Sequence, residues 1–154
     1  MPCACQSRPA IMQDSLGSPG KERSCPRILL ADDNAEILGY VGGLLAPDYD
    51  VIGKVVDGNA VCAEVKRLKP DLVVQDISMG DCSGIQIARR LREQGYGGEI
   101  VFLTVHDDPD FVTAAIGSGG RGYVIKSRIG QDLSLALKAV LEHRIFISAP
   151  LKQF

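Results

Sequence analysis

Short apolar runs alternate with amphipathic stretches along most of this chain, and this alternation constrains its fold more than any single motif. Five such runs follow Pro26, and LVV, IVFL and YVI within them are continuous rather than alternating in polarity. Continuous apolar runs of this length are typical of strands buried on both faces of a parallel sheet. We therefore predict strands at residues 27–31, 50–56, 72–76, 100–104 and 122–125.

Each stretch that follows a predicted strand carries apolar residues at helical spacing. Pro70 is expected to end the second helix and Ser83 to cap the third, while Gly39, Gly42 and Gly43 weaken the first. Five strands that alternate with five helices predict an α/β domain with a doubly wound parallel sheet. The predicted helix faces are Ile37, Leu38, Val41, Leu44 and Leu45; Val61, Val65 and Leu68; Ile87, Ala88 and Leu91; Val112, Ala115 and Ile116; and Leu133, Leu137, Val140 and Leu141.

Charged and polar side chains stand where the predicted strands end. Asp32 and Asp33 follow the first strand, Asp76 ends the third, Thr104 ends the fourth and Lys126 follows the fifth. Taken singly, Asp32 or Asp33 would be interpreted as a helix cap and Asp76 as a loop acid. Thr104 alone would be an ordinary strand residue, and Lys126 alone a surface charge. Because such sheets bind ligands at the carboxyl ends of their strands, we expect these side chains to converge. Clustered carboxylates suit Mg²⁺, which prefers oxygen ligands, and a nearby hydroxyl and ammonium suit a phosphoryl group.

The composition is typical of a soluble protein, and 154 residues are enough for one domain with a hydrophobic core. Its net charge of −2 provides no basic field, so we expect no direct nucleic-acid binding and no attraction to an acidic membrane. No segment approaches the roughly 20 apolar residues of a membrane helix, and the N-terminus lacks the apolar core of a signal peptide. We expect a cytoplasmic protein.

The N-terminal segment and the cysteines carry less information. Residues 1–25 are rich in Pro, Gly, Ser and charge without a sustained period, which predicts a flexible leader. The five cysteines are irregularly spaced, so we predict reduced thiols. Cys3 and Cys5 could in principle grip a metal, but neither of the two histidines lies near them in the sequence.

Four segments of the chain resemble the receiver domain of two-component response regulators. They are ILLADDNAEI, DLVVQDISMGDCSG, IVFLTVHDD and GYVIKS, in the expected order, and the resemblance covers about residues 26–150. It implies a flavodoxin-like fold with a five-stranded sheet in the order 2-1-3-4-5, and it leaves residues 151–154 as a tail. It also implies a signalling phosphoacceptor, which catalyses only its own phosphotransfer and dephosphorylation, rather than an enzyme.

Position by position, the resemblance implies a phosphoacceptor and a metal site. Asp76 matches the aspartate that takes a phosphoryl group from a phosphohistidine on a sensor histidine kinase or a phosphotransfer protein. Asp32, Asp33, Asp76 and the backbone carbonyl of Ser78 match the ligands of Mg²⁺, the implied cofactor. In this assignment Asp33 binds the ion directly and Asp32 mostly through water.

The resemblance also implies a conformational switch. Thr104 would bond one phosphoryl oxygen and Lys126 another, and Tyr123 occupies the position of the switch aromatic residue. In the family, the threonine shifts toward the phosphate and the ring turns inward, which remodels the face of the fourth helix, fifth strand and fifth helix. We expect this face, including Phe111, to bind a partner or a second copy of the chain.

The last matching segment is most similar to one subfamily. GYVIKS, the helix after it and HRIFISAPL resemble receivers that carry a helix-turn-helix output domain, which links the chain to transcription regulation. The chain stops at Phe154 without that domain. We expect either a stand-alone receiver or one whose output domain was lost or cut away.

Four positions depart from the family pattern or modify it. Gly80 stands where proline is usual and is expected to loosen the loop after Asp76. Val105 replaces a small residue, and we expect it to crowd the phosphoryl entry path, slow phosphotransfer from small donors and alter dephosphorylation. Ser127 replaces a proline, so no cis peptide is expected there. His106 is either a residue that tunes hydrolysis or a solvent-exposed loop histidine.

Other functions fit the sequence less well. A receiver-like interaction module that needs no phosphate stays open because of Gly80 and Val105. A Mg²⁺-dependent phosphatase of small molecules would place two acids two residues apart on one loop, whereas Asp32 and Asp33 are adjacent. A flavin site would need a phosphate cradle where the first loop is acidic. Residues 117–122 match GxGxxG, but they follow a helix and precede a strand, the reverse of a dinucleotide motif.

Overall fold

A computed structural model describes residues 25–148 of the chain. The leader predicted at residues 1–25, except Cys25, and the tail predicted at residues 151–154 lie outside the described residues. Cys62 and Cys82 are free thiols, whereas Cys25 is disulfide-bonded, which corrects the prediction of a reduced thiol at that position. No helix in the described part of the chain is long and apolar enough to cross a membrane.

A parallel sheet in the order β2-β1-β3-β6-β7-β8 forms the centre of the domain. Its first five strands are the predicted ones in the predicted order 2-1-3-4-5, so the flavodoxin-like fold is confirmed. The sixth strand is a short addition beside β7 that the sequence analysis did not predict. The strands are β1 (Arg27–Ala31), β2 (Asp50–Val55), β3 (Leu72–Gln75), β6 (Glu99–Thr104), β7 (Gly122–Ile125) and β8 (Phe146–Ile147).

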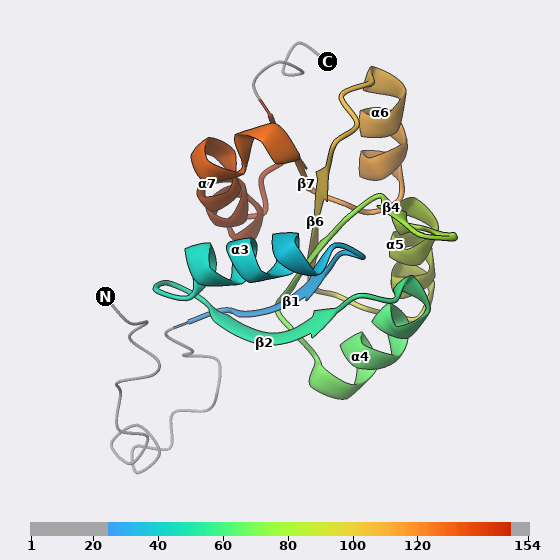
Figure 1. Cartoon of the computed structure of the whole chain (residues 1–154). Coiled ribbons are helices and arrows are strands. Elements are labelled where there is room, and N and C mark those ends of the chain that lie inside the picture. Colours follow the sequence, from blue (N-terminus) through green and yellow to red (C-terminus); the bar gives the residue numbers. More distant parts are fainter. Residues whose placement is uncertain (1–24, 149–154) are drawn as a thin grey trace.

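In the described part of the chain, five α-helices cover the two faces of this sheet, as predicted (Figure 1). One face packs against α3 and α7, and the other packs against α4, α5 and α6. Each face thereby encloses its own cluster of buried apolar side chains, and the sheet separates the two clusters. The helices are α3 (Ala35–Leu45), α4 (Val61–Leu68), α5 (Gly84–Glu93), α6 (Pro109–Gly117) and α7 (Ile129–Leu141), with 3₁₀ turns η2 (Gly58–Ala60) and η3 (Lys126–Arg128).

Local signals explain where most helices begin and end. Helix α3 forms despite its glycines because Asn34 caps it, accepting hydrogen bonds from the N–H groups of Glu36 and Ile37. Its predicted apolar face needs one correction, since Leu44 is 40% exposed. Helix α4 ends before Pro70, and the Ser83 hydroxyl caps α5, both as predicted.

The loop after β3 is folded rather than irregular. Its strands β4 (Ser78–Met79) and β5 (Cys82–Ser83) form an antiparallel hairpin. The hairpin gives this loop a defined conformation, and the expectation that Gly80 loosens its backbone stays a prediction. Gly84, which follows the hairpin, lies so close to the carbonyl of Asp76 that an added Cβ would stand 2.0 Å from that oxygen. The hairpin is thus held tightly against the end of β3.

Candidate functional site

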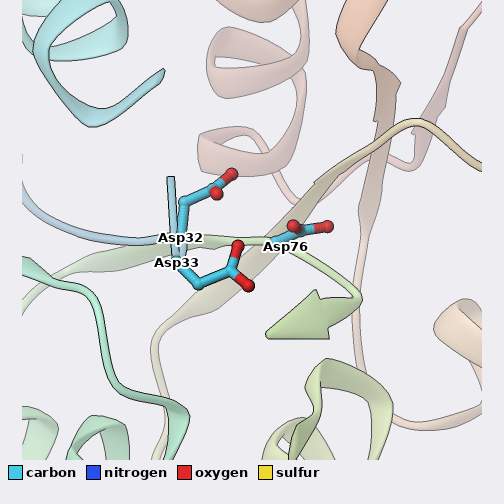
Figure 2. Close-up of side chains that lie close together, drawn as sticks. All are labelled: Asp32, Asp33 and Asp76. Carbon is cyan, nitrogen blue, oxygen red and sulfur yellow. The ribbon is translucent and has the colours of Figure 1, made fainter. Parts of the chain in front are cut away.

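Three carboxylates meet at the edge where the strands end. Asp32 and Asp33 follow β1, and Asp76 follows the neighbouring strand β3, whose ladder it extends by donating its N–H to Ala31 O at 3.0 Å. One carboxylate oxygen from each of the three lies within 4.8 Å of the others (Figure 2). Asp32 and Asp76 are buried, whereas Asp33 is exposed. Strand order therefore brings together acids that are more than forty residues apart.

Lys126 supplies the positive charge of this cluster. It begins η3 directly after β7, and its Nζ lies 2.8 Å from Asp32 Oδ2 and 3.2 Å from Asp76 Oδ2. Burial alone would lower the pKa of Lys126, but its contacts with these two carboxylates outweigh burial and raise it. The ammonium group therefore remains charged at neutral pH and bridges the two buried acids.

Asp76 carries a carboxyl group that is costly to ionise. Burial raises its pKa, the charge of Lys126 opposes that effect, and the neighbouring Asp32 carboxylate adds to it. With one ammonium among three carboxylates, the cluster keeps an excess of negative charge. A buried excess of this kind favours a bound cation.

The oxygens of the three acids fit a hard divalent cation. A backbone N–H holds one oxygen of each: Asn34 N donates to Asp32 Oδ1 at 2.9 Å, Gly80 N to Asp33 Oδ2 at 3.0 Å and Ser78 N to Asp76 Oδ1 at 3.2 Å. The buried Asp32 Oδ2 lies against Lys126 Nζ at 2.8 Å and contacts no other donor among the described residues. Carboxylate oxygens grouped in this way are the donor set that Mg²⁺ takes.

Thr104 and Tyr123 are both tied to the backbone of His106. Thr104 ends β6 and is fully buried, and its Oγ1 accepts a hydrogen bond from His106 N at 3.1 Å. Tyr123 lies in the neighbouring strand β7, equally buried, and its hydroxyl donates to His106 O at 2.7 Å. Burial raises the pKa of Tyr123, so the phenol remains a hydrogen-bond donor at neutral pH. One residue thus contacts both side chains that the resemblance assigns to the switch.

The His106 side chain joins the two loops that flank the carboxylates. Its Nε2 lies 3.0 Å from Ser78 Oγ, and its ring stacks on Phe111 with the ring centroids 4.1 Å apart. His106 is half-buried, so it is not a solvent-exposed loop histidine. The sequence analysis singled out His106 but missed the Ser78 hydroxyl and the Gly80 N–H. A Gly-Asp dipeptide at positions 80–81, where two-residue hairpins place such pairs, was the available signal.

Val105 and Ser127 are the two remaining positions that depart from the family pattern. The Val105 side chain is 68% exposed, so whether it crowds an incoming phosphoryl group stays a prediction. The residues that the structure describes contain no cis peptide, and this includes the Lys126–Ser127 bond. Gly117 ends α6 and Gly122 begins β7, which is the reverse of a dinucleotide motif.

Comparisons with known proteins point to one family. A family model described as the response regulator receiver domain matches residues 28–138. Among curated proteins, the transcriptional regulatory protein DesR of Bacillus subtilis is 32% identical over 116 residues, which cover 74% of this chain and 57% of DesR. The nitrate/nitrite response regulator protein NarL of Escherichia coli K12 is 31% identical over 126 residues, covering 80% and 58% of the two chains. This chain therefore spans little more than half of these relatives.

Solved structures give the same picture. A two-component response regulator of the LuxR family from Aurantimonas sp. SI85-9A1 has a TM-score of 0.79 and 30% identity, and the match covers 84% of this chain and 94% of that one. The isolated REC domain of RcsB from Salmonella enterica serovar Typhimurium, solved with the phosphomimetic BeF₃⁻, has a TM-score of 0.76 and covers 84% and 97%. At 23% identity this second likeness concerns the fold alone.

Proposed function

This chain belongs to the response regulator receiver domain family, and from that membership we propose that it is a phosphoacceptor in a two-component phosphorelay, acting in the cytoplasm. The acceptor in this proposal is Asp76, and the reaction depends on Mg²⁺. The observation that carries the proposal is the position of the Asp76 carboxylate, buried at the end of β3 between Lys126 and two further acids. Such a receiver is a signalling protein, and its only chemistry is on itself.

The proposed transfer moves a phosphoryl group from nitrogen to oxygen. One Asp76 carboxylate oxygen attacks the phosphorus of a phosphohistidine on a sensor histidine kinase or a phosphotransfer protein. A phosphorus–oxygen bond forms as the phosphorus–nitrogen bond breaks, and the released imidazole keeps the bonding electron pair and takes up a proton. Mg²⁺, held by Asp32, Asp33, Asp76 and the Ser78 carbonyl, would neutralise charge on the phosphoryl oxygens. The product is an acyl phosphate on Asp76.

Lys126 and Thr104 have defined tasks in this proposal. Lys126 Nζ already touches Asp76 Oδ2, so it can follow the negative charge as it spreads from that carboxylate onto the phosphoryl oxygens. Thr104 ends the strand next to β3, and its hydroxyl would turn to donate to a second phosphoryl oxygen. That movement would disturb the His106 N–Thr104 Oγ1 hydrogen bond, and with it the Tyr123 contact to His106 O.

The output surface in this proposal is the face formed by α6, β7 and α7. The pairing of β8 with β7 modifies it, because the edge that β7 would present is occupied by Phe146–Ile147. A partner would therefore meet α6, α7 and β8 rather than an open strand edge. Solved relatives include two RcsB dimers bound to two parallel DNAs. For this chain we propose a second copy or an output protein of a transcription pathway as the partner.

The test is phosphorylation of the pure protein, read by intact mass spectrometry. Wild type with Mg²⁺ and a small phosphodonor should gain one phosphoryl group, and it should gain none when Mg²⁺ is chelated. Asp76→Asn should gain none under either condition. Equal labelling of wild type and Asp76→Asn would remove Asp76 from the proposal, and no labelling of either with donor and with a phosphorylated kinase would refute the function.

One observation favours a second candidate, a receiver-like interaction module that needs no phosphate. Tyr123 is fully buried, and its hydroxyl donates a hydrogen bond to His106 O. A chain that rests in this conformation could bind its partner constitutively. Self-association measured by sedimentation separates the two functions: the module predicts equal association of wild type and Asp76→Asn with and without phosphodonor, whereas the receiver predicts a change in wild type alone.

A further inference from the structure

Gly80 occupies the turn of the hairpin that follows the acceptor aspartate. Met79 pairs with Cys82, so Gly80 and Asp81 are the two central residues of the turn. Gly80 has a φ of +63°, as the first central residue of two-residue hairpin turns requires, and L side chains rarely adopt this conformation. Glycine therefore gives this turn its defined shape.

The turn is anchored against the core, so its N–H groups have fixed positions. Met79 is buried in the apolar cluster beneath α4, α5 and α6. On the other strand, Cys82 packs against Gly58, where an added Cβ would lie 2.6 Å from Cys82 Cβ. The hairpin is held from both of its strands.

From this position the hairpin holds two acids of the site. Ser78 N donates to Asp76 Oδ1, and Gly80 N donates to Asp33 Oδ2 at 3.0 Å across 47 positions of sequence. Asp33 is the exposed member of the three acids and would otherwise be free to change rotamer. A hydrogen bond from a fixed N–H to its charged oxygen removes that freedom.

We propose that Gly80 is a positioning residue for the metal ligand Asp33, its N–H holding Oδ2 and thereby fixing the carboxylate in the site. The inference rests on the proposed function, because it takes Asp33 to be a Mg²⁺ ligand. The proline that is usual here in the resembling family has no N–H and a φ near −65°. The glycine of this chain thus adds an orienting contact that a proline cannot make.

Two substitutions separate the N–H from the shape of the turn. Gly80→Pro removes the donor and also moves φ away from +63°. Gly80→Asn keeps the donor and also strains the turn, because a side chain is rarely compatible with this φ even though a Cβ here meets nothing within 4 Å. Loss of a group that orients a metal ligand costs about 10-fold or more in metal affinity. We expect Mg²⁺ dissociation constants within about threefold of wild type for Gly80→Asn and about tenfold weaker for Gly80→Pro.

The measurement is Mg²⁺ binding by isothermal titration calorimetry, with thermal unfolding in chelator as the check of folding. A folded Gly80→Pro that binds Mg²⁺ as tightly as wild type would overturn the inference. So would equal losses in the two variants, because turn shape would then be the cause. If Gly80→Pro fails to fold, amide NMR of the Gly80 N–H replaces it: the resonance should move in Asp33→Ala, and an unmoved resonance would overturn the inference.

This binding assay needs no phosphate, so the two proposals can fail separately. Wild type that binds Mg²⁺ with the expected order of variants, but never accepts a phosphoryl group, would refute the proposed function and keep the inference. Wild type that is phosphorylated, while Gly80→Pro binds Mg²⁺ normally, would do the reverse. Wild type that binds no Mg²⁺ would overturn the inference whatever the phosphorylation result.

Discussion

At the edge where the strands end, three acids lie close together and one lysine contacts two of them, whereas at the edge where the strands begin an arginine is matched to backbone carbonyls. There, Arg92 Nη1 donates to the carbonyls of Tyr96 and Gly98, and its Nη2 donates to Gly119 O, at 2.7–2.8 Å. The guanidinium thus ties the loops that precede β6 and β7. The charges of the beginning edge are paired within the chain, and the ending edge has an excess of negative charge.

The comparison shows that a hollow does not by itself mark a functional site. A hollow of about 420 Å³ opens at the beginning edge, beside Arg92, Glu99 and Arg121. Its arginines already bond to the protein, since Arg121 Nη1 donates to His143 O and Arg121 Nε lies 3.4 Å from Glu99. At both edges a buried carboxylate oxygen, Asp32 Oδ2 or Glu99 Oε1, has a cation beside it but no hydrogen bond among the described residues. The ending edge differs because three acids gather there, and this excess of negative charge, rather than volume, distinguishes the proposed site.

Removing Lys126 should have the largest effect, because it takes away the cation that contacts both Asp32 and Asp76. For Lys126→Met we expect phosphorylation of Asp76 to slow by about 100-fold, the usual cost of losing a donor that stabilises transferred charge. Intact mass spectrometry over time measures the rate. Lys138→Met, an exposed lysine of α7, is the matched control and should keep the wild-type rate. Equal phosphorylation rates for Lys126→Met and wild type would mean that the charge of Lys126 does not distinguish the ending edge from the beginning edge.

Removing Arg92 should affect stability and leave the chemistry intact. Arg92→Met deletes three hydrogen bonds from a charged donor to backbone carbonyls, and we expect it to lower the free energy of unfolding by about 2–4 kcal/mol. Urea unfolding measures this loss, and Arg89→Met, exposed on the same helix, should change it by less than about 0.5 kcal/mol. Mg²⁺ affinity should be unchanged. A large loss of Mg²⁺ affinity in Arg92→Met would show that the edges are coupled.

The contrast also explains how much of the site could be read from the sequence. The strands could be predicted from their continuous apolar runs. Because the carboxyl ends of parallel strands meet at one edge, Asp32, Asp76 and Lys126 could be placed together from the sequence alone. The pairing of Lys126 with both acids depends on rotamers, which no periodic pattern records. The missed elements, β4, β5 and β8, are strands of two residues, too short to show a period.

The repulsion between the acids of the ending edge should make the stability of the fold depend on pH. Burial raises the pKa of Asp76 in the folded state, so the folded state binds this proton more tightly than the unfolded state does. Its ionisation therefore destabilises the fold, and stability is lost as pH rises through the folded pKa. Without metal, we expect Asp76→Asn to melt a few degrees above wild type at neutral pH.

The gap in melting temperature between Asp76→Asn and wild type should close toward acid pH, because wild-type Asp76 is then protonated. Thermal scans of both proteins in chelator, from acid to neutral pH, measure it. Lys126 keeps Asp32 as a partner in the variant, so the comparison isolates the Asp76 charge. A gap that widens as pH falls would mean that Asp76 is stabilising when ionised, and the ending edge would then resemble the beginning edge.

The smallest effect is expected at Val105, which follows Thr104 at the ending edge. A β-branched side chain next to the switch threonine should hinder approach to Asp76, so Val105→Ala should react faster with a small phosphodonor. Because the side chain is 68% exposed, the gain should stay near the limit for surface substitutions, about two- to threefold. Val56→Ala, at a valine that is 54% exposed just beyond β2, controls for loss of a surface valine. Equal rates for Val105→Ala and wild type would mean that access to the acceptor is set by the charged groups alone.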